Sequence, residues 1–144
     1  MKIMDSAKYL VHLSYRAKVG SLTPLKLQKL LYLAQGWSYV WDGVPLFEDE
    51  FEAWQYGPVN IDIYNHFKQY GKGEIPEEES APLYELDMSK DEQETLESIW
   101  YEYSNWSAFS LVELTHQQAP WRDNYGKGCI ISNSDIKQYF QSTF

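Results

Sequence analysis

The stretch from Leu22 to Gly71 constrains the fold of this chain more than any other part of the sequence. It opens with a threonine and a proline, followed by apolar residues spaced three and four positions apart. Threonine is a preferred N-cap residue, and proline is favoured at the first helical position. The apolar positions on one helical face are Leu27, Leu30, Leu31, Ala34, Trp37 and Trp41. This pattern predicts an amphipathic helix from Thr23-Pro24 to Asp42-Gly43, in which Gly36 lets another backbone pack closely.

The second half of the stretch predicts a strand, a turn and another helix. Residues 51–56 alternate partly between apolar and polar types, which is typical of a strand. Because a single strand is marginal, we expect residues 44–47 to pair with it as a small ribbon. Gly57-Pro58 predicts the end of the strand. Asn60 is a good N-cap for a helix to about Tyr70, with Gly71 closing it. Its inward-facing residues are predicted to be Tyr64 and Phe67.

The flanking segments predict further helices. Asp5 or Ser6 is expected to cap a first helix running to about Val19, with Gly20 as its C-terminal cap. Residues 71–88 are rich in Gly, Pro and acid, which predicts an exposed loop with a brief strand at 83–86.

Beyond this loop, Ser89 and Glu92 form a capping box at the start of the next helix. Its predicted inward residues are Leu96, Ile99, Trp100 and Tyr103. Residues 104–107 interrupt it, and a helix at 108–118 ends before Pro120. A last helix at 135–141 places Ile136 and Phe140 inward. The fold class predicted for residues 1–144 is therefore mainly α with a minor β element, in one domain of five to six helices.

The composition narrows the classes of partner. The formal net charge of −9 weighs against nucleic acid as the main partner, because such affinity comes largely from Lys and Arg on phosphates. The same charge is compatible with a basic protein partner. The six Trp and twelve Tyr are many for 144 residues, and these side chains are favoured both in cores and at interfaces. We assign most of them to the core and a minority to a partner surface.

The sequence also indicates where the protein works and what it lacks. The N-terminus has no basic segment followed by an apolar one, and no apolar run approaches the length of a membrane span. We therefore expect a cytoplasmic protein without a membrane partner. Cys129 is the only cysteine, so a disulfide within the chain is impossible. The three histidines lie far apart in sequence, and we expect neither a metal nor a cofactor.

His116 is the best candidate for a catalytic residue, since the sequence contains no P-loop, nucleophile elbow or dinucleotide fingerprint. It lies at a predicted helix end with Asp123 nearby, an arrangement that can make a general base oriented by a carboxylate. The alternative is a histidine that satisfies carbonyls at the helix C-terminus beside Trp121. We favour that second interpretation and expect no enzymatic activity.

Three blocks of the sequence, in order, resemble the Panacea domain, the family of SocA-like antitoxins and phage-associated GepA-like proteins. The first block is the helical run at 22–36 and the second is the Phe-Glu-Ala-Trp-Gln-Tyr-Gly-Pro-Val segment at 51–59, followed by Tyr64. The third, weaker block is His116 with Pro120 and Trp121. The matching family-motif residues outside the first block include Gly57, Pro58, Tyr64, His116, Pro120 and Trp121.

The resemblance implies an antitoxin that neutralises a cognate toxin by direct protein contact, with delivery of the toxin to an ATP-dependent protease as a further option. A phage or mobile-element accessory protein without a toxin partner is the alternative, and a hydrolase using His116 is less favoured. Whether the protein forms a homodimer stays open.

The segment Trp54-Gln55-Tyr56 supplies aromatic residues beside a rigid turn, which are the components of a binding hot spot. The alternative is that Trp54 belongs to the core and Tyr56 only packs on the turn. Lys26 and Lys29 are interpreted as the polar face of their helix, with Tyr32 one turn beyond Lys29. The residues predicted to bind the partner are Lys29, Tyr32, Trp54, Gln55 and Tyr56.

Overall fold

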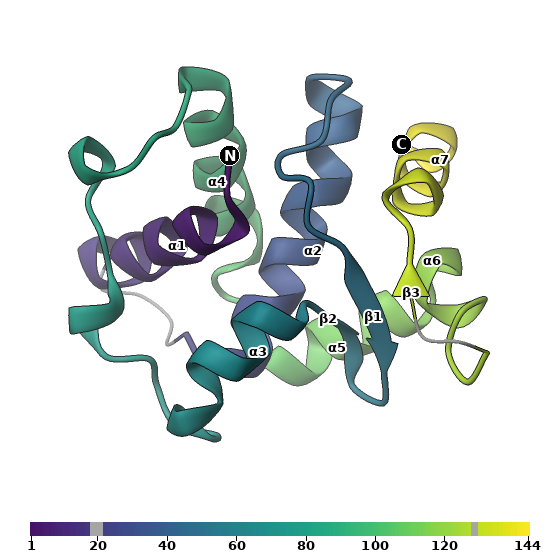
Figure 1. Cartoon of the computed structure of the whole chain (residues 1–144), viewed down its shortest axis with the longest axis horizontal. Coiled ribbons are helices and arrows are strands. Elements are labelled where there is room, and N and C mark those ends of the chain that lie inside the picture. The colour runs from purple at the N-terminus through teal and green to yellow at the C-terminus, as the bar shows by residue number, and fades with distance from the viewer. Residues whose placement is uncertain (18–21, 128–129) are drawn as a thin grey trace.

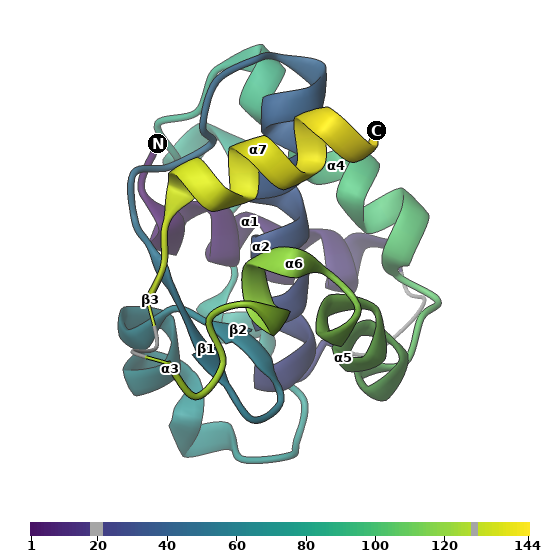
Figure 2. The same cartoon turned by 90° about the vertical axis from the view of Figure 1, so that its right-hand side faces the viewer.

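The computed structural model describes residues 1–17, 22–127 and 130–144. Helix α2 (Pro24–Trp41) runs through the centre of the molecule, roughly perpendicular to its longest axis (Figure 1). Helices α1 (Ile3–Ala17) and α4 (Lys90–Tyr103) pack on one side of it, and α7 (Asn133–Thr143) crosses its other side (Figure 2). The remaining helices are α3 (Ile61–Phe67), α5 (Ala108–His116) and α6 (Ala119–Arg122). The predicted mainly α fold with a minor β element is confirmed.

The central position of α2 explains why its sequence is apolar around most of its circumference. Thr23 caps it as predicted, since its side chain accepts from the backbone N–H of Lys26, and Pro24 is at its start. Leu27, Leu30 and Leu31 are fully buried. The space beside Gly36 is filled by the ring of Phe140 on α7, so a side chain packs there and not another backbone as predicted.

The small sheet differs from the predicted ribbon. Strand β1 (Phe51–Trp54) pairs antiparallel with β2 (Gly57–Val59) on one side and with β3 (Ile130–Ile131) on the other. The prediction that Gly57-Pro58 follows the strand and breaks it was wrong, because both residues belong to β2 and the turn lies at Gln55-Tyr56.

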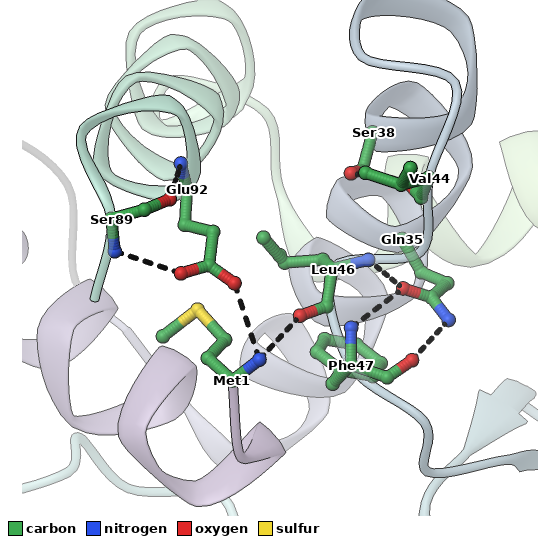
Figure 3. A network of polar contacts seen from close by, with 8 residues as sticks. All are labelled: Met1, Gln35, Ser38, Val44, Leu46, Phe47, Ser89 and Glu92. Atoms are coloured by element: carbon green, nitrogen blue, oxygen red, sulfur yellow. Dashed lines mark hydrogen bonds and ion pairs between the residues drawn. The ribbon is translucent and has the colours of Figure 1, made fainter. Parts of the chain in front are cut away.

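Residues 44–47 form no strand, so the predicted ribbon partner was also wrong. Their backbone bonds to side chains of α2 instead (Figure 3). The Gln35 carboxamide oxygen accepts from the N–H groups of Leu46 and Phe47 at 2.8 and 3.2 Å, and its nitrogen donates to the Phe47 carbonyl at 2.8 Å. Ser38 donates to the Val44 carbonyl at 2.8 Å. A buried glutamine therefore does what a partner strand was expected to do.

Several helix boundaries follow the predicted caps, and several do not. Asn60 caps α3 and Ser89 with Glu92 forms the capping box of α4. Helix α1 already begins at Ile3, which places Asp5 and Ser6 inside it, while its predicted end at Val19 and the Gly20 cap lie outside the described residues. Cys129 also lies outside them. Tyr64 was predicted to face inward, but it is 40 % exposed, and Ile63 and Phe67 are the buried residues of α3.

The segment at 71–88 contains two short 3-10 turns, η2 (Glu77–Glu79) and η3 (Leu83–Glu85), so the predicted strand at 83–86 was wrong. A third 3-10 turn, η1 (Lys68–Tyr70), extends α3. Pro120 does not simply stop a helix; it is the second residue of α6, where its missing N–H costs nothing. None of the helices in the described ranges is long and apolar enough to cross a membrane.

A braced hairpin as the candidate functional site

The β1–β2 hairpin brings the second sequence block to the surface. Trp54 pairs with Gly57 in the last register position, and Gln55 and Tyr56 form the exposed tip between them. The Tyr56 side chain is 55 % exposed, whereas Trp54 is half-buried. Gly57 has a φ of +104°, a backbone conformation that favours glycine. The predicted segment 54–56 is thus a tight surface turn bounded by a glycine whose conformation it needs.

The carbonyl groups of this tip are held from α5 and α6. The indole N–H of Trp121 donates to the Trp54 carbonyl at 2.7 Å, and Nε2 of His116 donates to the Gln55 carbonyl at 3.0 Å. The two rings stack on each other with centroids 3.9 Å apart and planes 20° apart. The third sequence block therefore braces the second, although 61 and 67 residues separate the bonded pairs.

This contact corrects the expected role of His116. The histidine does not satisfy carbonyls at the end of its own helix but one in the hairpin, and Nε2 must carry a proton to donate there. Asp123 lies beside Arg122, with 3.5 Å between the Arg122 Nε and an Asp123 oxygen. With the proton on Nε2, the basic nitrogen of the neutral ring is Nδ1, and Nε2 serves as a hydrogen-bond donor to the hairpin. Across residues 1–17, 22–127 and 130–144, no group of three or more His, Cys, Asp or Glu is placed to hold a metal ion.

Lys29 on α2 supports the hairpin from its buried side. Its side chain is fully buried, and its ammonium group donates to the Pro58 carbonyl at 2.8 Å. Pro58 has no N–H, so its pair with Ala53 cannot exchange two backbone hydrogen bonds, and its carbonyl faces away from β1 toward α2. Burial lowers the pKa of Lys29 to about 7. A Cβ at Gly57 would lie 2.5 Å from the Lys29 Cε, so a larger residue at position 57 would displace the lysine side chain.

Gln28 holds the end of the hairpin in the same manner. Its carboxamide oxygen accepts from the Asn60 N–H at 2.9 Å, and its nitrogen donates to the Asn60 carbonyl at 3.0 Å. The Asn60 side chain in turn donates to the Glu50 carbonyl at 2.8 Å. Gln28 and Gln35 are seven residues apart on α2, and each acts as a surrogate strand for an extended segment. Sequence reasoning missed both glutamines, although two Gln at heptad spacing in an apolar helix were the available signal.

Two of the predicted partner-binding residues lie inside the protein. Lys29 and Tyr32 are both fully buried, so the interpretation of Lys26 and Lys29 as a polar helix face was wrong: Lys26 is only 5 % exposed. The Tyr32 hydroxyl donates to the Gln118 carboxamide oxygen at 2.8 Å, and burial raises its pKa well above the ordinary value. In this conformation both residues support the site from within, while Trp54, Gln55 and Tyr56 remain candidates for direct contact.

An apolar groove lies beside the hairpin. Its volume is about 460 Å³, and it separates the hairpin from α3 and the first turn of α2. The Trp54 and Tyr64 rings meet edge to face across 4.8 Å, and the Lys68 ammonium lies 5.9 Å from the Tyr64 ring centre. The side chains that line the groove include Pro24, Leu25, Trp54, Tyr56, Val59, Ile63, Tyr64 and Phe67. The exposed aromatic tip and the groove form one continuous surface, which we call the hairpin face.

The fold and this face define a small helical domain that carries a braced aromatic hairpin. A family model described as "Antitoxin SocA-like, Panacea domain" matches residues 27–122, and the chain belongs to that family. The chain is also similar to Antitoxin SocA of Caulobacter vibrioides (strain NA1000 / CB15N), at 31% identity over 136 residues that cover 83% of this chain and 72% of that protein. No solved structure matches the chain. The predicted family resemblance is confirmed.

Proposed function

We propose that this protein is an antitoxin that neutralises a cognate toxin by direct contact through the hairpin face. The observation that carries the proposal is the bracing of the tip. Three carbonyls, those of Trp54, Gln55 and Pro58, accept hydrogen bonds from side chains on other elements, while the Tyr56 ring projects into solvent. A backbone fixed before binding loses little conformational entropy on association.

The residues of the face suit protein recognition. Tyr and Trp are enriched among the residues that dominate binding energy, and such residues concentrate beside pockets from which water is excluded. Tyr56 and Trp54 border the apolar groove, which offers room for an apolar side chain of the toxin. The net charge of −9 favours encounter with a basic partner. Membership of the SocA-like family supports the assignment of that partner as a toxin.

The proposal has a second part, in which the protein delivers the bound toxin to an ATP-dependent protease. It predicts that the toxin disappears faster in cells that contain both this protein and the protease, whereas simple blocking predicts a stable complex. A phage accessory role without a toxin is the alternative to both, and it predicts that no neighbouring gene product is toxic.

The experiment begins with the product of the adjacent gene. We expect it to arrest growth when expressed alone, to be tolerated when this protein is co-expressed, and to co-purify with it. Absence of rescue together with absence of a complex would contradict the proposal.

The second step locates the interface. Tyr56→Ala is expected to weaken the complex by about 30-fold or more, the range of an aromatic hot spot. Its matched control is Glu78→Ala, an exposed residue of the η2 turn, which is expected to change affinity by less than about twofold. Trp54→Ala should also exceed Glu78→Ala. A titration in which Glu78→Ala has the larger effect would move the interface away from the hairpin.

A further inference from the structure

A second surface lies at the other end of α2. It is a hollow of about 590 Å³ between the last turn of α2 and the outer face of α4. We call it the α2–α4 groove, and its lining residues are Trp41, Glu94, Glu97, Ser98, Tyr101 and Glu102. Thr95 on α4 donates to the carboxylate of Asp42 at 3.3 Å, which ties the two walls together. We propose that this groove binds a basic segment of a partner polypeptide.

Two exposed aromatic rings frame the groove. Trp41 is 46 % exposed and Tyr101 is 83 % exposed. Trp41 stacks on Trp37 with centroids 5.2 Å apart, so its position is fixed by the layer beneath it. Indole and phenol faces attract guanidinium and ammonium groups through the ring quadrupole, and Trp is the strongest of these acceptors. The rings therefore provide stacking surfaces for cationic side chains.

The groove is lined by three carboxylates. Glu94, Glu97 and Glu102 lie along α4, whose composition is strongly acidic. The cation beside Glu94 is Lys90, at 4.0 Å in an exposed pair of the kind that contributes little. Glu97 accepts hydrogen bonds from the Tyr9 hydroxyl and from Gln93. Partial burial alone would raise the pKa of Glu97, but these hydrogen bonds and the positive charges of Arg16 and Lys90 lower it below the usual value, so its carboxylate stays ionised.

Charge complementarity indicates which kind of partner the α2–α4 groove can bind. Arginine combines planar stacking on aromatic rings with bidentate hydrogen bonds to carboxylates, and lysine supplies a point charge for the same groups. A second copy of this chain would bring a net charge of −9 and the same acidic helix to the groove. Nucleic acids and anionic lipids are repelled for the same reason. The groove therefore fits a polypeptide segment rich in Arg or Lys.

The α2–α4 groove is separate from the hairpin face. Pro24 borders the hairpin groove and Trp41 borders the second one, so the 18 residues of α2 span the distance between them. At 1.5 Å per residue that distance is about 27 Å. Both surfaces can be occupied at once, and the second one needs no toxin for its own test.

The test is a titration of the full chain with a fluorescein-labelled 12-residue peptide that contains four Arg and two Leu, and with the same peptide carrying Glu in place of Arg. We expect saturable binding of the Arg peptide alone. Trp41→Ala with Tyr101→Ala should weaken binding at least tenfold, and Glu94→Lys with Glu102→Lys should abolish it. Circular dichroism establishes that each variant is folded.

The control is a tyrosine of nearly the same exposure elsewhere on the surface. Tyr84 is 86 % exposed on η3, and Tyr84→Ala with Glu77→Lys and Glu78→Lys removes an equivalent ring and reverses two acidic residues. This variant should bind the Arg peptide within about twofold of the unmodified chain. An equal loss in this variant would mean diffuse attraction to an acidic protein and would overturn the site.

Two further outcomes would also overturn the proposal: no binding of the Arg peptide, or a dimer of this chain that disappears in the Tyr101→Ala variant. Tyr56→Ala separates the two surfaces, because it should retain peptide binding while it weakens the toxin complex. Peptide binding without rescue on co-expression would contradict the proposed antitoxin role and leave the second site intact.

Discussion

The hairpin at 51–59 and the segment at 71–88 both lie outside the α-helices, but the protein holds them in different ways. The hairpin tip is braced by side chains of Lys29, His116 and Trp121, each bonded to a backbone carbonyl. The segment at 71–88 is tied at intervals, for example where the Ile75 N–H donates to the Leu22 carbonyl at 2.9 Å and the Tyr15 hydroxyl donates to the Ile75 carbonyl at 2.6 Å.

The two regions also present different chemistry to solvent. The hairpin exposes the Tyr56 ring next to an apolar groove, while the second segment exposes the Tyr84 ring together with carboxylates such as Glu77 and Glu78. Bracing by buried polar side chains is costly unless every partner is satisfied. Such side chains, with their partners satisfied, support the aromatic turn, which is the arrangement expected where the shape of the turn matters for function.

Substitution of one glycine in each region gives the largest expected difference. Gly57 and Gly71 both have positive φ, +104° and +56°. At Gly57 a new Cβ would lie 2.5 Å from the Lys29 Cε and 2.8 Å from the Thr115 hydroxyl, whereas at Gly71 nothing lies within 4 Å. We expect Gly57→Ala to lower the free energy of unfolding by about 3 kcal/mol or more, from backbone strain plus overpacking.

Gly71→Ala carries the backbone strain alone, so we expect a loss of about 1–2 kcal/mol. Urea denaturation of both variants measures the comparison. Equal losses would mean that the space beneath Gly57 can relax and that the bracing is not tight.

The sequence predicted local features well. The caps at Thr23, Asn60 and Ser89 and the burial of the α2 leucines depend on neighbouring residues, and they agree with the structure. The assignment of Trp41 to the same apolar face was wrong, because its side chain at the end of α2 is 46 % exposed. Contacts between distant residues were not predictable in this way. Strand β3 is two residues long, lies about 80 residues away from β1 in the sequence and has no alternation pattern from which the pairing could be predicted.

The candidate site shows the same division. The exposed tip at Gln55 and Tyr56 lies in the segment that composition and resemblance indicated, and its role in binding stays a prediction. The burial of Lys29 was missed because a lysine in an amphipathic helix is ordinarily solvated, and its partner inside the protein, the carbonyl of Pro58, is 29 residues away in the sequence. The bond from His116 to the hairpin was missed because its acceptor, the Gln55 carbonyl, is 61 residues away in the sequence.

The burial of Lys29 predicts that the free energy of unfolding depends on pH, an effect that the exposed lysine of the segment at 71–88 should not produce. In the unfolded chain Lys29 stays protonated up to its ordinary pKa of 10.5, whereas in the folded protein its pKa is about 7. The unfolded state therefore binds more protons between these values, and stability rises with pH across that window. From pH 7 to pH 9 the free energy of unfolding should increase by about 2 kcal/mol from this residue.

Lys29→Met is expected to remove most of that increase, while Lys72→Met, an exposed lysine in the segment at 71–88, should leave it in place. The measurement is urea denaturation at pH 7, 8 and 9. The series stops at pH 9 because Tyr9 has the opposite effect at higher pH. Burial and the contact with Glu97 raise the pKa of Tyr9 to about 12 in the folded protein, so the tyrosine ionises first in the unfolded chain, and this lowers the stability of the folded state. The same slope in Lys29→Met and the unmodified protein would show that the lysine is not the group responsible.

The smallest expected difference lies between two histidines. His116 holds the Gln55 carbonyl and stacks on Trp121, whereas His66 contacts a carboxylate oxygen of Glu79 at 3.0 Å on the surface. His116→Ala should lower the free energy of unfolding by about 1 kcal/mol, the usual contribution of one hydrogen bond. His66→Ala should lower it by about 0.5 kcal/mol or less, because exposed polar contacts with a carboxylate contribute little.

The partner-binding readout sharpens this last comparison. A histidine that only capped its own helix would leave binding unchanged in His116→Ala, whereas a brace adjacent to Tyr56 predicts a several-fold loss of affinity for the toxin. His116→Gln keeps an N–H donor in the side chain and should recover part of that loss. His66→Ala should leave affinity unchanged. A catalytic His116 would instead lose its function equally in the Ala and Gln variants, and a loss of affinity in neither would mean that the tip keeps its shape without this hydrogen bond.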